Sequence, residues 1–367
     1  MLINRLKLND YRNYETLDFN PAPGLNVIAG ENAQGKTNAL EAVFLCAFGK
    51  SHRANTRDAA LIRRGMPGGY VGITLQNTVG THTIEIKLRT DEARKTLVDG
   101  QPIKRMGELM GTLNAVLFSP EDLCLVKGTP QDRRRFMDME LSQMYPTYFY
   151  RLQQYNHALK QRNALLKESP LAVKPGMLAM WDEQLATLGE SIVDARCKFL
   201  DELSTLAYDL HRQISGNRER LNISYDPNVD IESSASVRET LLDSLSQSAQ
   251  EDLRRGFTTV GPHRDDIAIK LEETDLRVYG SQGQQRTAAL SLRLSEIALL
   301  REVKGEPPVL LLDDVLSELD ENRQRMLLEA TKGCQCFLTC TSLSGIEKAG
   351  ILDMEVFTCE KGSLRKT

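Results

Sequence analysis

Apolar positions near the start of the chain follow patterns that predict a sheet and one buried helix. Residues 25–29 (LNVIA) are a short apolar run suited to a strand, and the segment from about Gly35 to Phe48 suits a helix. Apolar and polar residues alternate over Thr81–Leu88, as in a half-buried strand. The Asp99-Gly100 pair that follows is typical of a two-residue hairpin turn. A further apolar run, Val116–Phe118, predicts another strand.

The middle of the chain has the helical period instead. One stripe with spacings of three and four runs through Phe149, Leu152, Asn156, Leu159, Asn163 and Leu166. A second stripe runs through Trp181, Leu185, Leu188, Ile192, Ala195 and Phe199. The stripes predict two amphipathic helices that pack antiparallel, with Asn156 and Asn163 fixing their register. Ordinary helices of a small lobe explain this pattern better than a true coiled coil does.

Strand patterns return from about Gly256 onward. Ile267, Ile269 and Leu271 share one face of a strand, and a long helix follows Gly283. Val309–Leu312 is a continuous apolar run, which suits a strand buried on both faces of a parallel sheet. The sequence therefore predicts an α/β head built from both ends of the chain, residues 1–122 and 253–367. Residues 123–252 are predicted to form an inserted helical lobe, a short antiparallel arm.

The composition is that of an ordinary globular protein in a reducing compartment. Of the 367 residues, 41% are hydrophobic and 26% are charged, which excludes a disordered or collagen-like chain. No apolar run approaches the roughly 20 residues of a membrane helix, and no secretory signal is visible. Seven cysteines are an odd number and fit free thiols better than a disulfide framework. We therefore expect a cytoplasmic protein with no membrane partner.

One loop carries the pattern of a phosphate-binding site. Residues 30–37 read GENAQGKT, which matches G-x-x-x-x-G-K-[ST] between a predicted strand and a predicted helix. Glycines allow backbone N–H groups to converge on phosphate oxygens, and the helix presents its positive N-terminus to the anion. Lys36 is then expected to reach the β- and γ-phosphates, and Thr37 to bind Mg²⁺. An accidental glycine turn is the weaker interpretation.

A second segment supplies the carboxylates that such a loop needs. Residues 309–314 read VLLLDD, an apolar strand that ends in two aspartates. Asp313 is predicted to lie beside the Mg²⁺, and Asp314 to orient or deprotonate the attacking water. An acidic turn after a core strand would be the default interpretation without the phosphate loop. Together, the two segments predict a site for ATP and Mg²⁺.

The run SQGQQ at residues 281–285 changes meaning with its neighbours. Considered alone, it is an N-cap and a turn that open a helix. Its place before the aspartate-terminated strand, with SELD at residues 317–320 just after, resembles the order of an ABC-type ATPase head. In that class the helix caps the γ-phosphate held by a second subunit. The resemblance implies an α/β fold, an ABC-type ATPase head with a mixed sheet flanked by helices. It also implies that ATP holds two copies of the chain together and that Ser281 of one copy acts on the nucleotide of the other.

Longer motifs resemble the RecF family, recombination mediators related to the heads of structural maintenance of chromosomes (SMC) proteins. The resemblance runs over nearly the whole chain. It is carried by YRNY at 11–14, GENAQGKTNALEA at 30–42, SHR at 51–53, FSPEDL at 118–123, GTP at 128–130, RRRFMD at 133–138 and GPHRDD at 261–266. Thr129 departs slightly from the small residue usual after that glycine.

The resemblance implies a function and a set of residues. It implies binding to single-stranded, gapped or junction DNA near the nucleoid, and work with RecO and RecR to load RecA in repair, replication-fork recovery and the SOS response. The implied nucleotide contacts are Arg12, Gly30, Asn32, Gly35, Lys36, Thr37 and Asn38 of one copy, with Ser281, Gly283 and Gln284 of the other. The implied catalytic residues are Asp313, Asp314 and Ser281, and the implied metal ligands are Thr37 and Asp313.

Two departures from a general ABC head predict slow, switch-like hydrolysis. No glutamine stands near residues 118–120, where such heads sense Mg²⁺ and the γ-phosphate. The strand predicted at residues 336–339 ends in Thr339-Cys340-Thr341, where many heads carry a histidine. We therefore expect a weak, DNA-stimulated ATPase. The alternatives are another ABC-type ATPase, either an SMC-like head or a transporter ATPase, and less plausibly a P-loop kinase.

Charge limits where DNA could bind. The net charge of −4 argues mildly against nucleic acid, so a DNA-binding surface has to be a local patch. Basic pairs and triplets supply the candidates, namely Arg63, Arg64, Lys104, Arg105, Arg133 and Arg134. Each is individually explained as solvated surface, whereas several on one face would follow a phosphate backbone. Three nearby cysteines, Cys334, Cys336 and Cys340, fit buried thiols better than a metal site.

Overall fold

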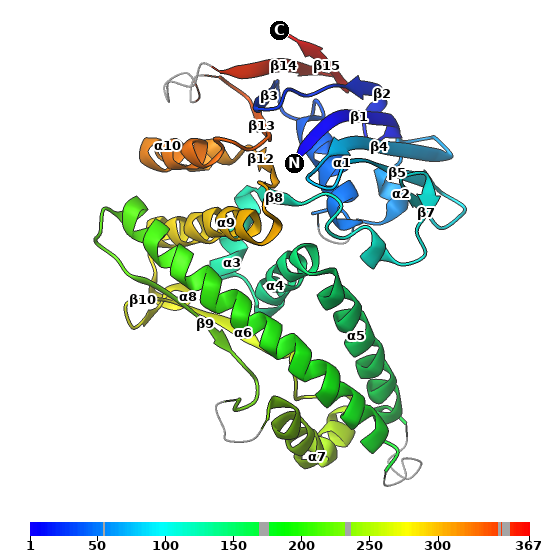
Figure 1. The fold of residues 1–367 in the computed structure, drawn as a ribbon, viewed down its shortest axis with the longest axis vertical. Helices are drawn as coiled ribbons and strands as arrows, with labels where there is room; N and C mark the ends of the chain where they lie inside the picture. The colour runs from blue at the N-terminus through cyan, green and yellow to red at the C-terminus, as the bar shows by residue number, and fades with distance from the viewer. Residues whose placement is uncertain (54–55, 169–175, 232–235, 344–345, 347–352) are drawn as a thin grey trace. The chain divides into compact units, whose positions relative to one another are not determined.

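Contacts divide the chain into two compact units, which are described one at a time. The computed structural model describes residues 1–53, 56–168, 176–231, 236–343, 346 and 353–367 (Figure 1). The first unit comprises residues 1–122 and 289–367, and the second comprises residues 123–288. The predicted functional division, with the head resuming at residue 253, stays a prediction. None of the described helices combines the length and the apolarity that crossing a bilayer requires.

The first unit contains two sheets of six described strands each. The antiparallel sheet has the order β2-β1-β4-β5-β6-β7, and the second has the order β15-β14-β3-β13-β12-β8. The antiparallel strands are β1 (Leu2–Tyr11), β2 (Tyr14–Phe19), β4 (Gly68–Gln76), β5 (Thr81–Arg89), β6 (Lys95–Val98) and β7 (Gln101–Pro102). The strands of the second sheet are β3 (Leu25–Ala29), β8 (Ala115–Phe118), β12 (Val309–Asp313), β13 (Cys336–Cys340), β14 (Met354–Glu360) and β15 (Ser363–Lys366). Only β15 pairs antiparallel in the second sheet, which is therefore mixed.

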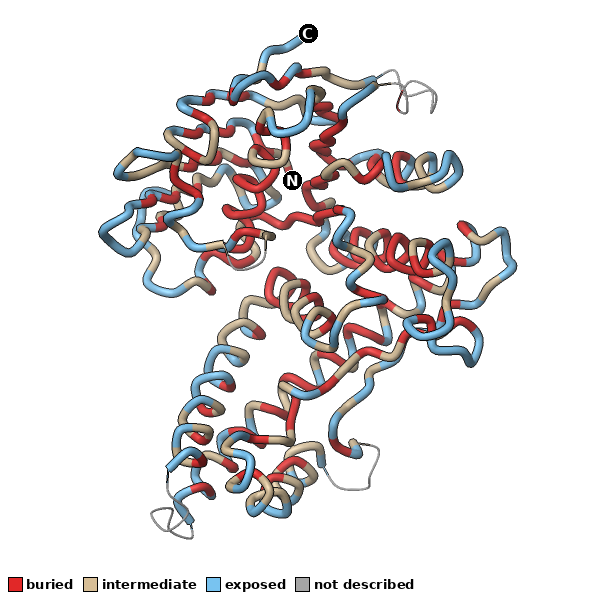
Figure 2. Tube along the Cα trace, turned by 180° about the vertical axis from the view of Figure 1, so that it is seen from behind, coloured by how far each residue is buried: buried red, intermediate tan, exposed pale blue. Residues whose placement is uncertain are grey.

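Helix α1 (Lys36–Phe48) packs between the two sheets of this unit. It contacts β4 and β5 of one sheet and β8, β12 and β13 of the other. Nearly all of its residues are buried, because a helix covered on both sides has no solvent face to keep polar (Figure 2). The remaining helical segments are α2 (Asp58–Leu61), η1 (Met106–Glu108), η2 (Pro120–Leu123), η3 (Val315–Glu318) and α10 (Glu321–Ala330). The first turn of α1 is thereby fixed at the ends of β3, β12 and β13.

The second unit combines helices with a small sheet. Its helices are α3 (Cys124–Lys127), α4 (Pro130–Met144), α5 (Pro146–Leu166), α6 (Ala179–Ser215), α7 (Val237–Arg255) and α8 (Leu276–Tyr279). Its strands are β9 (Leu221–Asp226), β10 (Asp266–Leu271) and β11 (Thr274–Asp275), in the order β11-β10-β9. Strand β9 lies inside the segment that we predicted to be helical, so the insertion is not purely a helical arm. The long helix α9 (Gln282–Lys304) begins in this unit and ends in the first.

Helices α5 and α6 run side by side, as predicted, but the buried stripe of α5 is shifted (Figure 1). Its buried residues are Tyr148, Tyr155, Ala158, Arg162 and Leu166. Asn156 is exposed, and Asn163 accepts hydrogen bonds from the backbone and hydroxyl of Thr258, both at 2.7 Å. The prediction that these asparagines fix the register between the two helices is therefore wrong. The stripe sits one residue away because a charged residue, Arg162, occupies the core position.

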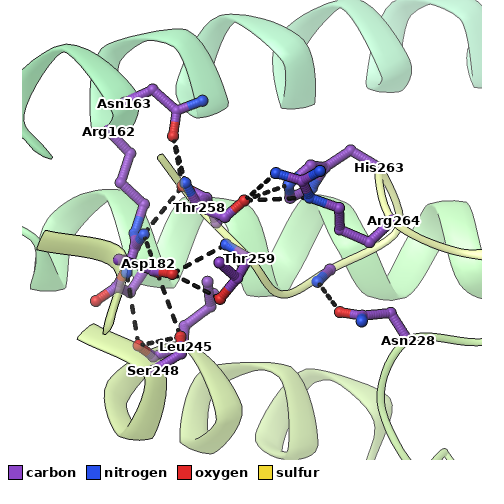
Figure 3. A network of polar contacts seen from close by, with 12 residues as sticks. Arg162, Asn163, Asp182, Asn228, Leu245, Ser248, Thr258, Thr259, His263 and Arg264 are labelled. Atoms are coloured by element: carbon purple, nitrogen blue, oxygen red, sulfur yellow. Dashed lines mark hydrogen bonds and ion pairs between the residues drawn. The ribbon is translucent and has the colours of Figure 1, made fainter. Parts of the chain in front are cut away.

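Arg162 is fully buried and compensated by residues from separate elements (Figure 3). Its Nε donates to Asp182 Oδ1 of α6 at 2.6 Å. Its Nη1 donates to Asp252 Oδ2 of α7 at 2.6 Å and to the hydroxyl of Thr258 at 2.9 Å. Two carboxylates thus surround one buried guanidinium, and we call this ion-pair cluster of the second unit the arginine cluster.

Candidate functional site

The phosphate loop lies between β3 and the N-terminus of α1, as the sequence predicts. Gly35 adopts a φ of +118°, and a Cβ there would stand 2.5 Å from the Asn13 side-chain amide nitrogen, so glycine is required. A Cβ on Gly30 would likewise meet the Cys359 carbonyl oxygen at 2.5 Å. Asn32 lies exposed in the same loop.

Lys36 is held by the loop itself. Its Nζ donates to the carbonyl oxygens of Gly30 at 2.6 Å and Glu31 at 2.8 Å, and the residue is only 7% exposed. These contacts place the ammonium group inside the curve of the loop. A cation at this position complements phosphate oxygens.

Thr37 and Asp313 come together although 276 positions separate them in the chain. The Thr37 hydroxyl donates to Asp313 Oδ1 at 2.8 Å. Strand β12 ends at Asp313, and α1 begins next to it, so the fold itself brings the two groups together. A hydroxyl and a carboxylate are hard oxygen ligands, and Mg²⁺ bound with phosphates needs only one or two such protein groups. The described residues include no cluster of three His, Cys, Asp or Glu side chains that could hold a metal ion by themselves.

Asp314 follows in a left-handed backbone conformation, with a φ of +51°. Its backbone N–H donates to the Thr339 hydroxyl at 3.0 Å. Burial raises the pKa of the Asp314 carboxyl; the charge of Lys36 opposes this shift and that of Asp313 adds to it. A carboxylate with a raised pKa is better suited to accept a proton than an ordinary one.

Arg12 is tied to α1 by an ion pair. Its Nε and Nη2 donate to the two oxygens of Glu41 at 2.8 and 2.6 Å, and its Nη1 donates to the Ala60 carbonyl. Glu41 also accepts from the Ser51 hydroxyl at 2.5 Å. Arg53 donates to Asn38 Oδ1 at 3.1 Å, which brings the predicted contact Asn38 into the same network. Arg12 thus lies beside the helix of the phosphate loop with its nitrogens already engaged.

Sequence reasoning missed three residues of this network. Glu41 is fully buried and joins Arg12 to Ser51, yet in the sequence it reads as one polar residue of an apolar helix. Asn13 donates to the Gln34 carbonyl at 2.7 Å and accepts from Asn38 at 2.8 Å, and the YRNY motif around it was the available signal. For Thr339 the only available signal was that many ABC heads carry a histidine at the end of the corresponding strand.

Ser281 lies in the second unit and begins α9. Its hydroxyl accepts from the Gln284 N–H at 3.3 Å, and its own N–H donates to Gln284 Oε1 at 2.8 Å, so the two residues cap the helix reciprocally. Ser281 and Gly283 are exposed, and Gln284 also donates to Glu219 at 2.9 Å. The prediction of an N-terminal cap is confirmed, and the first turn of the helix faces solvent.

The basic candidates for DNA contact differ in exposure. Arg64, Lys104 and Arg105 are exposed, and Arg63 pairs with Asp10 at 2.8 Å. The other two candidates belong to the second unit.

Arg133 donates to both oxygens of Asp266, at 2.6 and 2.8 Å, and its side chain is only 4% exposed. The guanidinium of Arg133 is thus enclosed and paired within the second unit, and its role in DNA binding stays a prediction. Arg134 donates to the Asp265 carbonyl at 2.6 Å, and burial and the charge of Arg196 lower its pKa. Its role in DNA binding stays a prediction.

The three clustered cysteines are buried thiols. Burial raises the pKa of the Cys336 thiol, and it raises the pKa of the Cys340 thiol to about 11. Arg301 lies 3.5 Å from the sulfur of Cys334. All three are free thiols rather than members of disulfides.

Comparisons with known proteins agree with this geometry. The family model of the RecF/RecN/SMC N-terminal domain matches residues 2–363. A protein named DNA replication and repair protein RecF, from Alkaliphilus oremlandii, is 43% identical over 99% of this chain and 100% of its own length. A protein of the same name from Lachnoclostridium phytofermentans is 40% identical over the full length of both chains.

Solved structures extend the likeness to three dimensions. The structure of the recombination mediator protein RecF-ATP in the RecFOR pathway matches with a TM-score of 0.92 and 36% identity, covering 100% of this chain and 97% of that one. A RecF-ATPrS structure matches with the same TM-score and identity. An SMC head bound to the C-winged helix domain of ScpA matches with a TM-score of 0.59 at 14% identity, which shows a common fold.

Proposed function

The chain belongs to the RecF family, and from this membership we propose that it is an ATP-dependent DNA-binding protein of recombinational repair. Its relatives are named DNA replication and repair proteins, and a solved relative at 36% identity carries ATP. The observation that carries the proposal is the meeting of Lys36, Thr37 and Asp313 around the first turn of α1. We expect this site to bind ATP with Mg²⁺.

The residues divide the work at that site. Lys36 neutralises phosphate charge, while the loop N–H groups around Gly35 and the N-terminus of α1 bind the phosphate oxygens. Thr37 and Asp313 would hold Mg²⁺, which neutralises charge that develops on the phosphates during transfer. Asp314 accepts a proton from water. Because Thr339, Cys340 and Thr341 stand where many heads carry a histidine, we expect slow turnover that serves as a switch.

Ser281 supports the proposal of a dimer. Its exposed hydroxyl and the N–H groups of the first turn of α9 have the chemistry to cap the γ-phosphate bound by a second copy. Gly283 and Gln284 belong to the same turn. ATP would then hold two copies together at two equivalent sites, which is the symmetry of an ordinary homodimer.

DNA and protein partners are proposed from family membership and charge. Exposed Arg64, Lys104 and Arg105 can contact phosphates without reading the sequence. We propose that the ATP-bound dimer recognises gapped, single-stranded or junction DNA. With RecO and RecR it would then promote loading of RecA, fork recovery and SOS induction.

The mass of the protein in solution tests this proposal. We expect a monomer without nucleotide, a dimer with ATP and Mg²⁺, and tighter binding of gapped DNA by the dimer. In Ser281→Arg the larger charged side chain blocks the capping turn, so the ATP-dependent dimer and the tighter DNA binding are both lost. Ser246→Arg, an exposed position on α7, is the matched control and behaves like the wild type. A dimer that persists in Ser281→Arg contradicts the role of this helix.

A further inference from the structure

Strand β13 runs between the strand of the phosphate loop and the strand of the aspartates. Within the second sheet it pairs in parallel with β3 on one side and with β12 on the other. In this register Thr339 lies next to Asp313 on one strand and next to Ile28 on the other. Thr339 therefore ends up at the carboxyl edge of the sheet, where the candidate site lies.

The Thr339 hydroxyl makes two short hydrogen bonds, each to a different aspartate. It donates to Asp313 Oδ1 at 2.8 Å and accepts from the Asp314 N–H at 3.0 Å. The Leu312 carbonyl lies farther away, at 3.5 Å. A hydroxyl has a single proton, and the carboxylate oxygen is both closer and charged, so the proton belongs to the bond with Asp313.

Two hydroxyls thus converge on one carboxylate oxygen. Thr37 and Thr339 each lie 2.8 Å from Asp313 Oδ1. The Thr37 hydroxyl is a proposed metal ligand in the first turn of α1, and the residue is partly exposed. Thr339 is only 1% exposed, and its hydroxyl already serves both aspartates. It is therefore the fixed contact of the pair, and the one that also holds the left-handed backbone of Asp314.

We propose that Thr339 is a positioning residue for the metal-dependent part of nucleotide binding. Its hydroxyl orients the Asp313 carboxylate and anchors Asp314, so the affinity for Mg²⁺ in the presence of ATP depends on it. This inference rests on the proposed function, since it concerns the same site. A threonine that merely fills space in β13 would make no such difference.

Thr339→Val tests the inference, because valine keeps the shape and the strand propensity but removes the hydroxyl. ATP affinity is measured by titration, once in EDTA and once over a series of Mg²⁺ concentrations. We expect the affinity in EDTA to stay unchanged. Mg²⁺ should increase the ATP affinity, and the Mg²⁺ concentration that gives half of this increase should be about 10- to 100-fold higher in the variant. This is the usual effect of losing a hydrogen bond to a metal ligand.

Two further variants complete the experiment. Thr339→Ser keeps the hydroxyl and should restore the Mg²⁺ dependence, which a space-filling role would not predict. Thr81→Val, at an exposed position of β5 in the other sheet, should match the wild type. If Thr339→Val fails to fold, Thr339→Ala removes the hydroxyl without adding bulk, and the same titration decides.

The outcomes separate this inference from the proposed function. A folded Thr339→Val protein with the Mg²⁺ dependence of the wild type overturns the role of Thr339 alone. A wild-type protein that binds no ATP at any Mg²⁺ concentration overturns the proposed function itself.

Discussion

The candidate nucleotide site of the first unit and the arginine cluster of the second are two different ways to hold charge inside a protein. Lys36 is held by carbonyl groups five and six residues away, in the loop that precedes it. Arg162 is held by Asp182, Asp252 and Thr258, which are 20, 90 and 96 residues away. The first arrangement is local and leaves its loop open to solvent, whereas the second is closed and complete. The first arrangement therefore suits the binding of a ligand, and the second suits the packing of helices.

The largest expected effect comes from breaking the closed arrangement. Arg162→Met keeps an unbranched side chain of similar length but leaves the Asp182 and Asp252 carboxylates buried without a cation. Removing one partner of such a cluster costs about 3–5 kcal/mol. The free energy of unfolding should fall by that amount, measured by urea denaturation, while ATP affinity of the folded protein stays unchanged.

Arg151→Met is the matched control for this prediction. Arg151 lies on the same helix, α5, but is exposed, so the substitution should change the free energy of unfolding by less than about 0.5 kcal/mol. Equal losses in both variants would show that the buried charges contribute nothing specific.

The opposite pattern is expected for Lys36→Ala in the first unit. A hydrogen bond to a charged group contributes about 1.5–3 kcal/mol, so ATP affinity should fall about 10- to 100-fold. The free energy of unfolding should change little, because the carbonyls of Gly30 and Glu31 border the open loop and remain accessible to water. Titration with ATP measures the effect, and exposed Lys7→Ala is the control. Unchanged ATP affinity in Lys36→Ala would contradict the proposal that this loop binds the phosphates of ATP.

The difference between local and long-range contacts also explains how much of the molecule the sequence could predict. Strands β3, β5, β8, β10 and β12 and helices α1 and α9 were predicted because their patterns are contiguous. Lys36 and Asp313 were proposed as site residues for the same reason. The antiparallel sheet begun by β1 was not foreseen, and β9 was assigned to a helical insertion.

What escaped prediction depends on residues far apart in the chain. Arg162 is charged, so the sequence pattern treats it as a solvent-facing position. The predicted buried face of α5 therefore passes through Asn156 and Asn163 instead. Glu41 and Thr339 were not predicted as site residues, because their partners are distant in the sequence. Only the folded chain brings Arg12 to Glu41 and Asp313 to Thr339. Patterns of period two or 3.6 report burial of apolar groups and are misled wherever a charge is buried.

His263 gives the smallest predicted effect and extends the comparison to pH. It lies beside the arginine cluster, where its Nε2 is 3.1 Å from the Thr258 carbonyl (Figure 3). Its Nδ1 is 2.8 Å from the Tyr155 hydroxyl. Burial lowers the pKa of His263 to about 4; the hydrogen bond to Thr258 opposes this, and the charges of Arg264 and Arg134 add to it. The folded protein therefore keeps this imidazole neutral while the unfolded chain, with an ordinary pKa of about 6.5, takes up a proton.

Because the unfolded state binds more protons between about pH 4 and pH 6.5, stability must fall as the pH falls through that window. From pH 7 to pH 5.5 the loss from this residue is about 1 kcal/mol. His263→Gln should remove that part of the pH dependence, as measured by urea unfolding at the two pH values, whatever it does to stability at pH 7. His157→Gln, at an exposed position on α5, should keep the wild-type difference between the two pH values. If the stability difference between the two pH values is unchanged in His263→Gln, the second unit tolerates a charged imidazole next to Arg264. The arginine cluster is then less closed than the contacts of Arg162 indicate.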